Sequence, residues 1–189
     1  SKSILLHRLG SNLSLETRGY NESFTINGVR FSLHPAGHIV GSAQIRIEHK
    51  GFIWVISGDY KWQEDHFTPP FEPVPCHTFI TESTFGLPVY QWRPQEEVIG
   101  EIHQWWAKNQ QEGLASVICA YSLGKAQRVM GHLNHNAGPV YLHGAVYNVN
   151  EALRQGGIPL PYFPKVPNQK TDYSQALIIA PPSALGSPW

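Results

Sequence analysis

The first half of the chain alternates hydrophobic and polar residues with a period of two, from Leu13 to Gly58. Asn27-Gly28 separates two alternating runs, which is the strongest short-range signal for a β-hairpin. Residues 29–34 and 43–48 carry a hydrophobic side chain at every second position, and Lys50-Gly51 predicts a second turn after them. This pattern predicts an antiparallel meander with one buried face. A short strand is predicted next, within residues 77–84.

The second half of the chain has a different pattern, in which helical spacing alternates with short apolar runs. A helix is predicted to begin at Pro94 and to end at Gly113, with Val98, Ile102, Trp105 and Trp106 at helical spacing. Apolar runs in 115–122, 138–146 and 173–183 predict buried strands, and helices are predicted over 123–133 and 148–157. Strands that alternate with helices are typical of a parallel α/β domain. We therefore expect an antiparallel layer in residues 1–86 and an α/β domain in residues 87–189.

Composition and charge narrow the function classes. The 189 residues include 41% hydrophobic and 15% charged residues, which favours a globular chain with a core. The formal net charge is zero, so the bulk composition has no basic signature of nucleic-acid binding. The only two cysteines, Cys76 and Cys119, lie far apart and favour a reducing, cytoplasmic setting. No apolar run reaches the length of a membrane span, and no membrane partner is expected.

Polar side chains follow the predicted strands, where the loops of a sheet commonly build a site. His38, Asp59 and Glu82 come after strands of the first half. Ser122 with Lys125, and Ser183, come after apolar runs of the second half. Each of these residues alone is more typical of a local cap or turn than of a functional site. Their recurrence at successive strand ends favours a functional site.

Five motifs in this order carry a family resemblance: HPAGHIVGSAQI, SGDY, TESTFG, YSLGKAQR and APPSALGSPW. Together they resemble the beta-CASP nucleases, which have a metallo-beta-lactamase fold. The chain looks most like the branch of DNA ligase-associated exonucleases, which is also described as an mRNA 3′-end processing factor. The resemblance implies a partial αββα metallo-beta-lactamase fold, hence an α/β class, with an inserted and partial α/β beta-CASP domain.

The resemblance also implies roles for individual residues. His38 and Asp59 match metal ligands of the family, and Asp59 would bridge two divalent metal ions, expected to be zinc. Glu82 matches an acidic residue of the catalytic centre, where it would orient a histidine. Ser122, Lys125 and Ser183 would contact the substrate, and Gln127 belongs to the same signature as Ser122. The family's His-x-His-x-Asp-His motif and two later histidines are not in the sequence, so the chain looks like an internal fragment that is inactive by itself.

The function implied by the resemblance is metal-dependent hydrolysis of phosphodiester bonds. The expected substrate is DNA rather than RNA, in repair together with an ATP-dependent DNA ligase. Metal ions and a few cations, Lys61, Arg93, Lys125 and Arg128, would supply the local positive field that the net charge lacks. Alternatives are a non-catalytic nucleic-acid-binding relative with a decayed metal site, an RNA 3′-end processing nuclease, and a hydrolase of small esters or lactones. His143 is interpreted as structural or substrate-facing, and His34 as a surface or packing residue.

Overall fold

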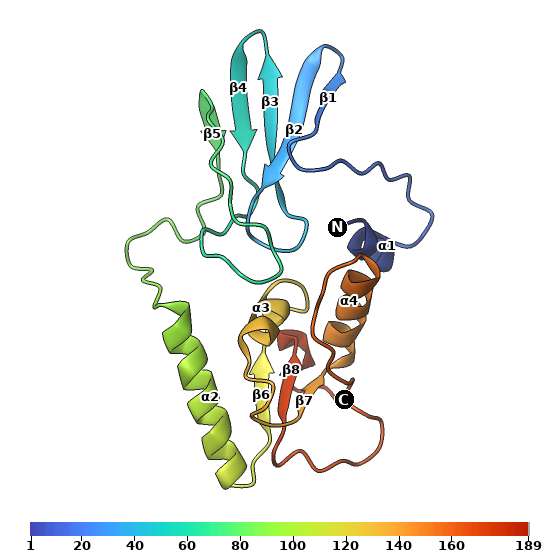
Figure 1. Cartoon of the computed structure of the whole chain (residues 1–189), viewed down its shortest axis with the longest axis vertical. Coiled ribbons are helices and arrows are strands. Elements are labelled where there is room, and N and C mark those ends of the chain that lie inside the picture. Colours follow the sequence, from blue (N-terminus) through green and yellow to red (C-terminus); the bar gives the residue numbers. More distant parts are fainter. Residues whose placement is uncertain (189) are drawn as a thin grey trace. The chain divides into compact units, whose positions relative to one another are not determined.

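A computed structural model describes residues 1–188 of the chain. The chain forms two compact units, Ser1–Tyr90 and Gln91–Trp189 (Figure 1). The division after Tyr90 lies four residues beyond the predicted boundary between residues 86 and 87. Trp189, which ends the motif APPSALGSPW, lies outside the described residues.

The first unit consists of one short helix and a five-stranded sheet. Helix α1, Lys2–Leu9, ends at Gly10, which has a φ of 91° and donates its N–H to the Leu6 carbonyl. The strands of the sheet follow one another in sequence order: β1 Ser23–Ile26, β2 Val29–Pro35, β3 Ala43–His49, β4 Phe52–Ile56 and β5 Thr78–Ile80.

Both predicted hairpins are confirmed. Asn27 and Gly28 have φ values of 48° and 79°, and Lys50 and Gly51 have values of 49° and 81°. Two successive residues with positive φ form the tight turn whose twist matches that of the flanking strands. The pairing of Ile26 with Val29 and of His49 with Phe52 follows directly from these two-residue turns.

Strand β5 departs from the expected antiparallel layer, because it pairs parallel to β4. The physical reason is the length of the connection between the two strands. A tight hairpin forces an antiparallel return, whereas the long segment 57–77 can cross over and bring the chain back in the same direction. The C-terminal ends of β4 and β5 therefore lie at the same edge of the sheet.

The prediction of one buried apolar face is wrong for the described residues. Ile45, Phe52 and Ile56 of the apolar face are 39%, 52% and 36% exposed. On the opposite, more polar face, Gln44 and Val55 are completely buried. The segment 57–76 accounts for this burial, because its residue Glu72 bonds to groups on the polar face.

The second unit is an α/β domain built on a three-stranded parallel sheet of order β6-β8-β7. This confirms the predicted parallel α/β class. In chain order its elements are α2 Gln95–Gln111, β6 Ser116–Cys119, α3 Lys125–His132, β7 Val140–Leu142, α4 Gly144–Gln155, β8 Leu177–Ala180 and the 3-10 turn η1 Pro182–Ala184.

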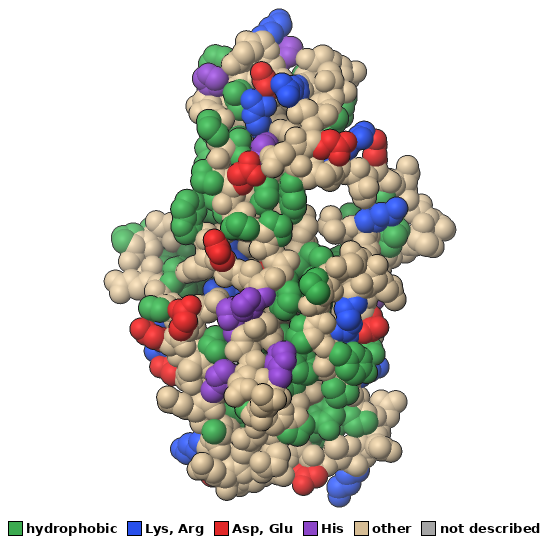
Figure 2. Space-filling view, viewed as in Figure 1, with side chains coloured by type: hydrophobic (Ala, Val, Ile, Leu, Met, Phe, Trp, Pro, Cys, Tyr) green, Lys and Arg blue, Asp and Glu red, His purple; other side chains and the backbone are tan. Residues whose placement is uncertain are grey.

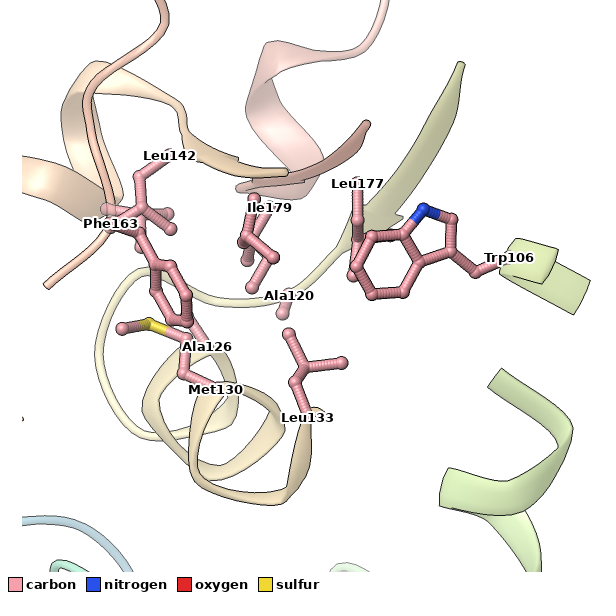
Figure 3. Close-up of a cluster of buried hydrophobic side chains, with 11 residues drawn as sticks. Trp106, Ala120, Ala126, Met130, Leu133, Leu142, Phe163, Leu177 and Ile179 are labelled. Atoms are coloured by element: carbon pink, nitrogen blue, oxygen red, sulfur yellow. The ribbon is translucent and has the colours of Figure 1, made fainter. Parts of the chain in front are cut away.

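The core of the second unit joins its central strand to the surrounding helices (Figure 3). All four residues of β8 are buried. Trp106 of α2 lies beside Leu177, and Met130 of α3 lies close to Phe163 in the same cluster. Trp106 is therefore a core residue, whereas its neighbour Trp105 is 39% exposed.

The visible surface has no region dominated by one sign of charge. On the face shown in Figure 2, acidic and basic side chains are interspersed among hydrophobic ones. Within residues 1–188, no helix combines the length and apolar character that crossing a membrane requires.

Replacing Leu142 by alanine tests the core of the second unit. Leu142 is completely buried, so Leu142→Ala should lower the free energy of unfolding by about 2–5 kcal/mol through lost burial and a cavity. Leu185→Ala is the control, because Leu185 is 68% exposed and its replacement should change stability by less than about 0.5 kcal/mol. Chemical denaturation followed by circular dichroism measures both. Equal effects of the two substitutions would contradict this assignment of the core.

Candidate metal centre and substrate site

His38 and Asp59 meet at one edge of the five-stranded sheet. His38 follows β2 and Asp59 follows β4, and both strands are antiparallel to β3, which lies between them. Their C-terminal ends therefore lie at the same edge. His38 Nε2 is 3.8 Å from Asp59 Oδ2, and the two side chains are 40% and 73% exposed. An imidazole nitrogen and a carboxylate oxygen thus converge on an accessible point.

Glu82 extends the same edge, because it follows β5, which runs parallel to β4. Its Oε2 accepts a hydrogen bond of 2.6 Å from the backbone N–H of Thr84. This bond is the main cause that lowers the pKa of Glu82, and the charge of His38 lowers it further. The carboxylate of Glu82 is therefore ionised and lies within electrostatic reach of His38.

The donor set at this edge fits a divalent metal ion in part. Imidazole nitrogen and carboxylate oxygen are both ordinary zinc ligands, and such sites take three or four protein ligands. Within residues 1–188, no group of three His, Cys, Asp or Glu side chains is placed to hold a metal ion. His38 and Asp59 could therefore supply two ligands of a metal site. Their roles as ligands, and that of Glu82, remain predictions.

The buried amide of Gln44 connects the two loops that carry these residues. Its Nε2 donates to the carbonyl of Pro35, at 2.9 Å, and to the carbonyl of Glu72, at 2.6 Å. Because both acceptors are carbonyls, the orientation of the amide is fixed. Its Oε1 is buried without a hydrogen-bond partner in the described part of the chain. Pro35 leads toward His38, whereas Glu72 lies in the segment that follows Asp59.

Backbone contacts close the same junction. Lys61 N donates to the Ala36 carbonyl at 3.0 Å, and Glu72 N donates to the Pro35 carbonyl at 3.1 Å. Gly37 has a φ of +71°, and a Cβ there would collide with the Lys61 carbonyl oxygen and lie 3.0 Å from Phe71 N. Only glycine permits this approach of the two loops. We refer to the contacts of Gln44, Gly37, Lys61 and Glu72 as the loop junction.

His34 belongs to an internal hydrogen-bonded group next to the loop junction. Its Nδ1 lies 2.9 Å from Glu72 Oε1, and its Nε2 lies 3.0 Å from Ser32 Oγ. His34 was predicted only as a surface or packing residue, and no role was predicted for Gln44 or Glu72. The alternation along β2 places Ser32 and His34 on one face, but no sequence signal identifies Glu72, 38 residues later, as their partner.

Asp65 fixes the segment that follows the loop junction. It forms an ion pair with Lys61 and accepts hydrogen bonds from the backbone N–H groups of Phe67 and Thr68, at 3.0 and 2.8 Å. Burial by itself raises the pKa of Asp65, but these hydrogen bonds and the charge of Lys61 outweigh burial and lower the pKa below 3.8. Asp65 is therefore an ionised, structural carboxylate.

The predicted substrate residues lie in the second unit, at the C-terminal edge of its sheet. Ser122 and Lys125 follow β6, and Ser183 lies in η1 after β8. These two parallel strands are neighbours, and Ala120 N donates to the Ala180 carbonyl at 2.8 Å just beyond their ends. The three side chains therefore share one edge of the sheet, as expected for residues at parallel strand ends. Their contact with a substrate remains a prediction.

Gln127 is a structural residue of this edge. It is 2% exposed, its Oε1 accepts from Gly124 N, and its Nε2 donates to the Ser122 carbonyl and to Asn150 Oδ1. The N–H of Ala126 is likewise used, since it donates to the carbonyl of Tyr121. Two N–H groups of the turn are thus bonded within the protein, and Gln127 stabilises the shape of the turn that carries Ser122.

His143 occupies the corresponding position after β7. It is the N-cap of α4, and its Nδ1 accepts a hydrogen bond of 3.1 Å from Ala145 N. This contact gives His143 the structural role that was one of its two interpretations.

The cations expected to attract nucleic acid are engaged in local contacts. Lys61 pairs with Asp65, and Arg93 pairs with Glu101 at 2.7 Å. Lys125 lies over the ring of Tyr121, with 5.1 Å between Nζ and the ring centroid. Arg128 bonds to Gln95. Lys61 and Arg93 therefore contribute less to a positive field than the sequence suggests.

The chain is similar to proteins of nucleic-acid metabolism. It is 33% identical over 132 residues to a "Probable DNA ligase" of Opitutus terrae, and the match covers 69% of this chain and 13% of that protein. It is 32% identical over 121 residues to "Cleavage and polyadenylation specificity factor 73" of Drosophila melanogaster, with 61% of this chain and 17% of that protein covered. It is 30% identical over 118 residues to "Endoribonuclease YSH1" of Saccharomyces cerevisiae, with 61% and 15% covered.

The chain thus corresponds to between 13% and 17% of the length of these three relatives. No family model matches the chain.

Replacing Gln44 by leucine tests the loop junction. The substitution leaves the carbonyls of Pro35 and Glu72 without their buried donor, so it should destabilise the first unit by roughly 2–4 kcal/mol. Hydrogen exchange of the amides of Lys61 and Glu72 should also accelerate, because both donate across the junction. Gln104→Leu is the control, since Gln104 is exposed on α2. Unchanged exchange at both amides in Gln44→Leu would contradict a role of Gln44 in holding the loops.

Replacing Asp65 by asparagine tests the ionised carboxylate. Because the pKa of Asp65 is lowered in the folded state, its stabilising contribution is present above pH 3.8 and is lost as the pH falls through the folded-state pKa. Asp65→Asn should therefore cost roughly 2 kcal/mol at about pH 7. The difference in melting temperature from wild type should narrow as the pH falls below 3.8. Glu64→Gln, at an exposed position of the same segment, is the control. A difference that is independent of pH would refute the ion pair.

Proposed function

The chain belongs to the beta-CASP family of metallo-beta-lactamase-fold nucleases, and from this premise we propose that the whole protein is a metal-dependent nuclease that hydrolyses phosphodiester bonds. One observation carries the proposal. His38 Nε2 and Asp59 Oδ2 come within 3.8 Å at an exposed sheet edge, inside a chain similar to endoribonucleases and to a probable DNA ligase. An imidazole nitrogen and a carboxylate oxygen that converge at an accessible edge are the ligand types that zinc takes.

Each of these side chains has a distinct task in the proposed centre. His38 would hold a metal ion through Nε2, in its deprotonated form. Asp59 has two carboxylate oxygens and is 73% exposed, so it can contact two cations. Glu82, held by Thr84 N–H, would keep a negative charge beside His38 and favour cations there. When bound, the divalent ions, which we propose to be two zinc ions, would polarise the phosphate and activate water.

The substrate-binding part of the proposal rests on the second unit. Ser122 and Ser183 offer hydroxyl groups at one sheet edge, and Lys125 contributes a cation that no carboxylate neutralises by a described ion pair. Hydroxyl groups and lysine are ordinary contacts to phosphate oxygens in nucleic-acid complexes. We propose that these three side chains hold the backbone of the substrate.

DNA is the proposed substrate, in repair together with an ATP-dependent DNA ligase, and the name of the Opitutus relative supports this. RNA is the second candidate, since the names of the yeast and fly relatives describe an endoribonuclease and a cleavage and polyadenylation factor. These names support both substrates equally. We also propose a reducing, cytoplasmic setting, which the free state of Cys76 and Cys119 supports.

The test uses the whole protein, with end-labelled DNA and RNA oligonucleotides of the same sequence. Asp59→Asn keeps the shape of the side chain but removes its charge, and should lower the hydrolysis rate by more than about hundredfold, because loss of a direct ligand exceeds the usual effect of its supporting groups. Metal content should fall in parallel. The melting temperature of the metal-free protein should be unchanged or higher, because an anion is removed from a site built for cations.

Asp172→Asn is the matched control, because Asp172 is an exposed carboxylate of the second unit that bonds to Ser174 N. It should leave both rate and metal content unchanged. If Asp59→Asn kept the wild-type rate and metal content, Asp59 would be only a turn residue and the proposal would be wrong. Binding of oligonucleotides without hydrolysis by the wild-type protein would instead identify a non-catalytic relative. The preferred oligonucleotide decides between DNA and RNA.

A further inference from the structure

Four aromatic rings contact one another in a continuous track, and the first of them in sequence directly follows Asp59. The ring centroids of Tyr60 and Phe71 are 5.2 Å apart, those of Trp62 and Phe71 are 5.4 Å apart, and those of Tyr60 and Phe79 are 6.5 Å apart. Trp62 is 70% exposed and Phe79 is 43% exposed. We refer to Tyr60, Trp62, Phe71 and Phe79 as the aromatic track. It begins one residue after the candidate metal ligand Asp59.

The track is mounted on a fixed backbone, although its outer rings are exposed. Lys61, next to Trp62, is held by the Ala36 carbonyl through its N–H and by Asp65 through its side chain. Phe71 N lies against Gly37, and the following residue, Glu72, bonds to Pro35 and Gln44. The backbone that carries the rings therefore does not need to be ordered when a ligand arrives, which lowers the entropic cost of binding.

The charge around the track favours bases over phosphates as its ligand. The cation nearest to Trp62 in sequence, Lys61, is neutralised by Asp65, and the side chain of Asp65 is only 6% exposed. This ion pair therefore offers a phosphate no unpaired positive charge. A base, in contrast, can stack on an aromatic ring without any charge. Aromatic side chains beside a path for the backbone are a common means of binding unpaired strands.

We infer that the aromatic track stacks unpaired bases of a single-stranded nucleic acid that enters the His38–Asp59 centre, with Trp62 as the principal stacking residue. This inference rests on the proposed nuclease function, which supplies the substrate class. It adds a preference for single strands over duplexes, because the faces of bases inside a duplex are already covered by the neighbouring base pairs. Trp62 acts on binding and takes no part in the bond cleavage.

The experiment measures binding separately from hydrolysis. The whole protein carrying Asp59→Asn is titrated with three fluorescently labelled probes, an intact single strand, a single strand with abasic sites and a duplex. Adding Trp62→Ala should weaken binding of the intact single strand by roughly 5- to 150-fold, the loss expected for one stacked base. Binding of the abasic strand and of the duplex should change by less than about twofold. Trp62→Phe should restore most of the affinity for the intact strand.

Phe52→Ala is the matched control. Phe52 is 52% exposed and lies at the opposite end of β4 from Asp59, four residues before Ile56 and so roughly 14 Å along the strand. It should leave all three affinities unchanged. In the hydrolytically competent protein, Trp62→Ala should raise KM for single strands by a similar factor and leave kcat within about twofold.

Two results would overturn the inference. One is unchanged affinity of Trp62→Ala for the intact strand, and the other is an equal loss for intact, abasic and duplex probes. Neither result concerns the catalytic proposal, which depends on the effect of Asp59→Asn on hydrolysis. Conversely, hydrolysis that survives Asp59→Asn would end the catalytic proposal and leave the binding comparison intact.

Discussion

The candidate centre depends on one buried side chain, the amide of Gln44. Its two hydrogen bonds join the end of β2 to the segment that follows Asp59, so that His38 and Asp59 are held at the same sheet edge. Removing an amide from water is unfavourable unless it is hydrogen-bonded, and here the two bonds to Nε2 offset that cost, while Oε1 has no partner among residues 1–188. Gln44 is completely buried beneath the candidate site. Because its hydrogen bonds are directional, it fixes a unique geometry of the two loops, which an apolar side chain would not do.

This junction links the two proposals for the first unit. The residues that hold Asp59 near His38 also hold Lys61 and Glu72, and these residues flank Trp62 and Phe71. The candidate metal ligands and the aromatic track are consequently carried by one hydrogen-bonded framework of loops. The apolar face of the same sheet, with Ile45 and Phe52, is exposed and has no such framework in the described residues.

Several features follow from the sequence alone. The turns at Asn27-Gly28 and Lys50-Gly51 are local, since they require positive φ and short connections, and period-two alternation fixes which residues share a face. The parallel α/β order of the second unit follows from alternating strand and helix signals. The approach of His38 to Asp59 is also predictable in this way, because two strands that are antiparallel to the one between them must end at the same edge.

The tertiary structure decided the contacts between segments that lie far apart in the sequence. The parallel pairing of β5 depends on the path of residues 57–77, and no local signal specifies that path. The burial of Gln44 and its pairing with Glu72 exist only once that path brings the segment onto the sheet. Local propensity and periodicity act over a few residues, whereas the partner of a buried polar group is chosen by packing. The sequence therefore determined the elements and the candidate ligands, and the tertiary structure determined what holds them in place.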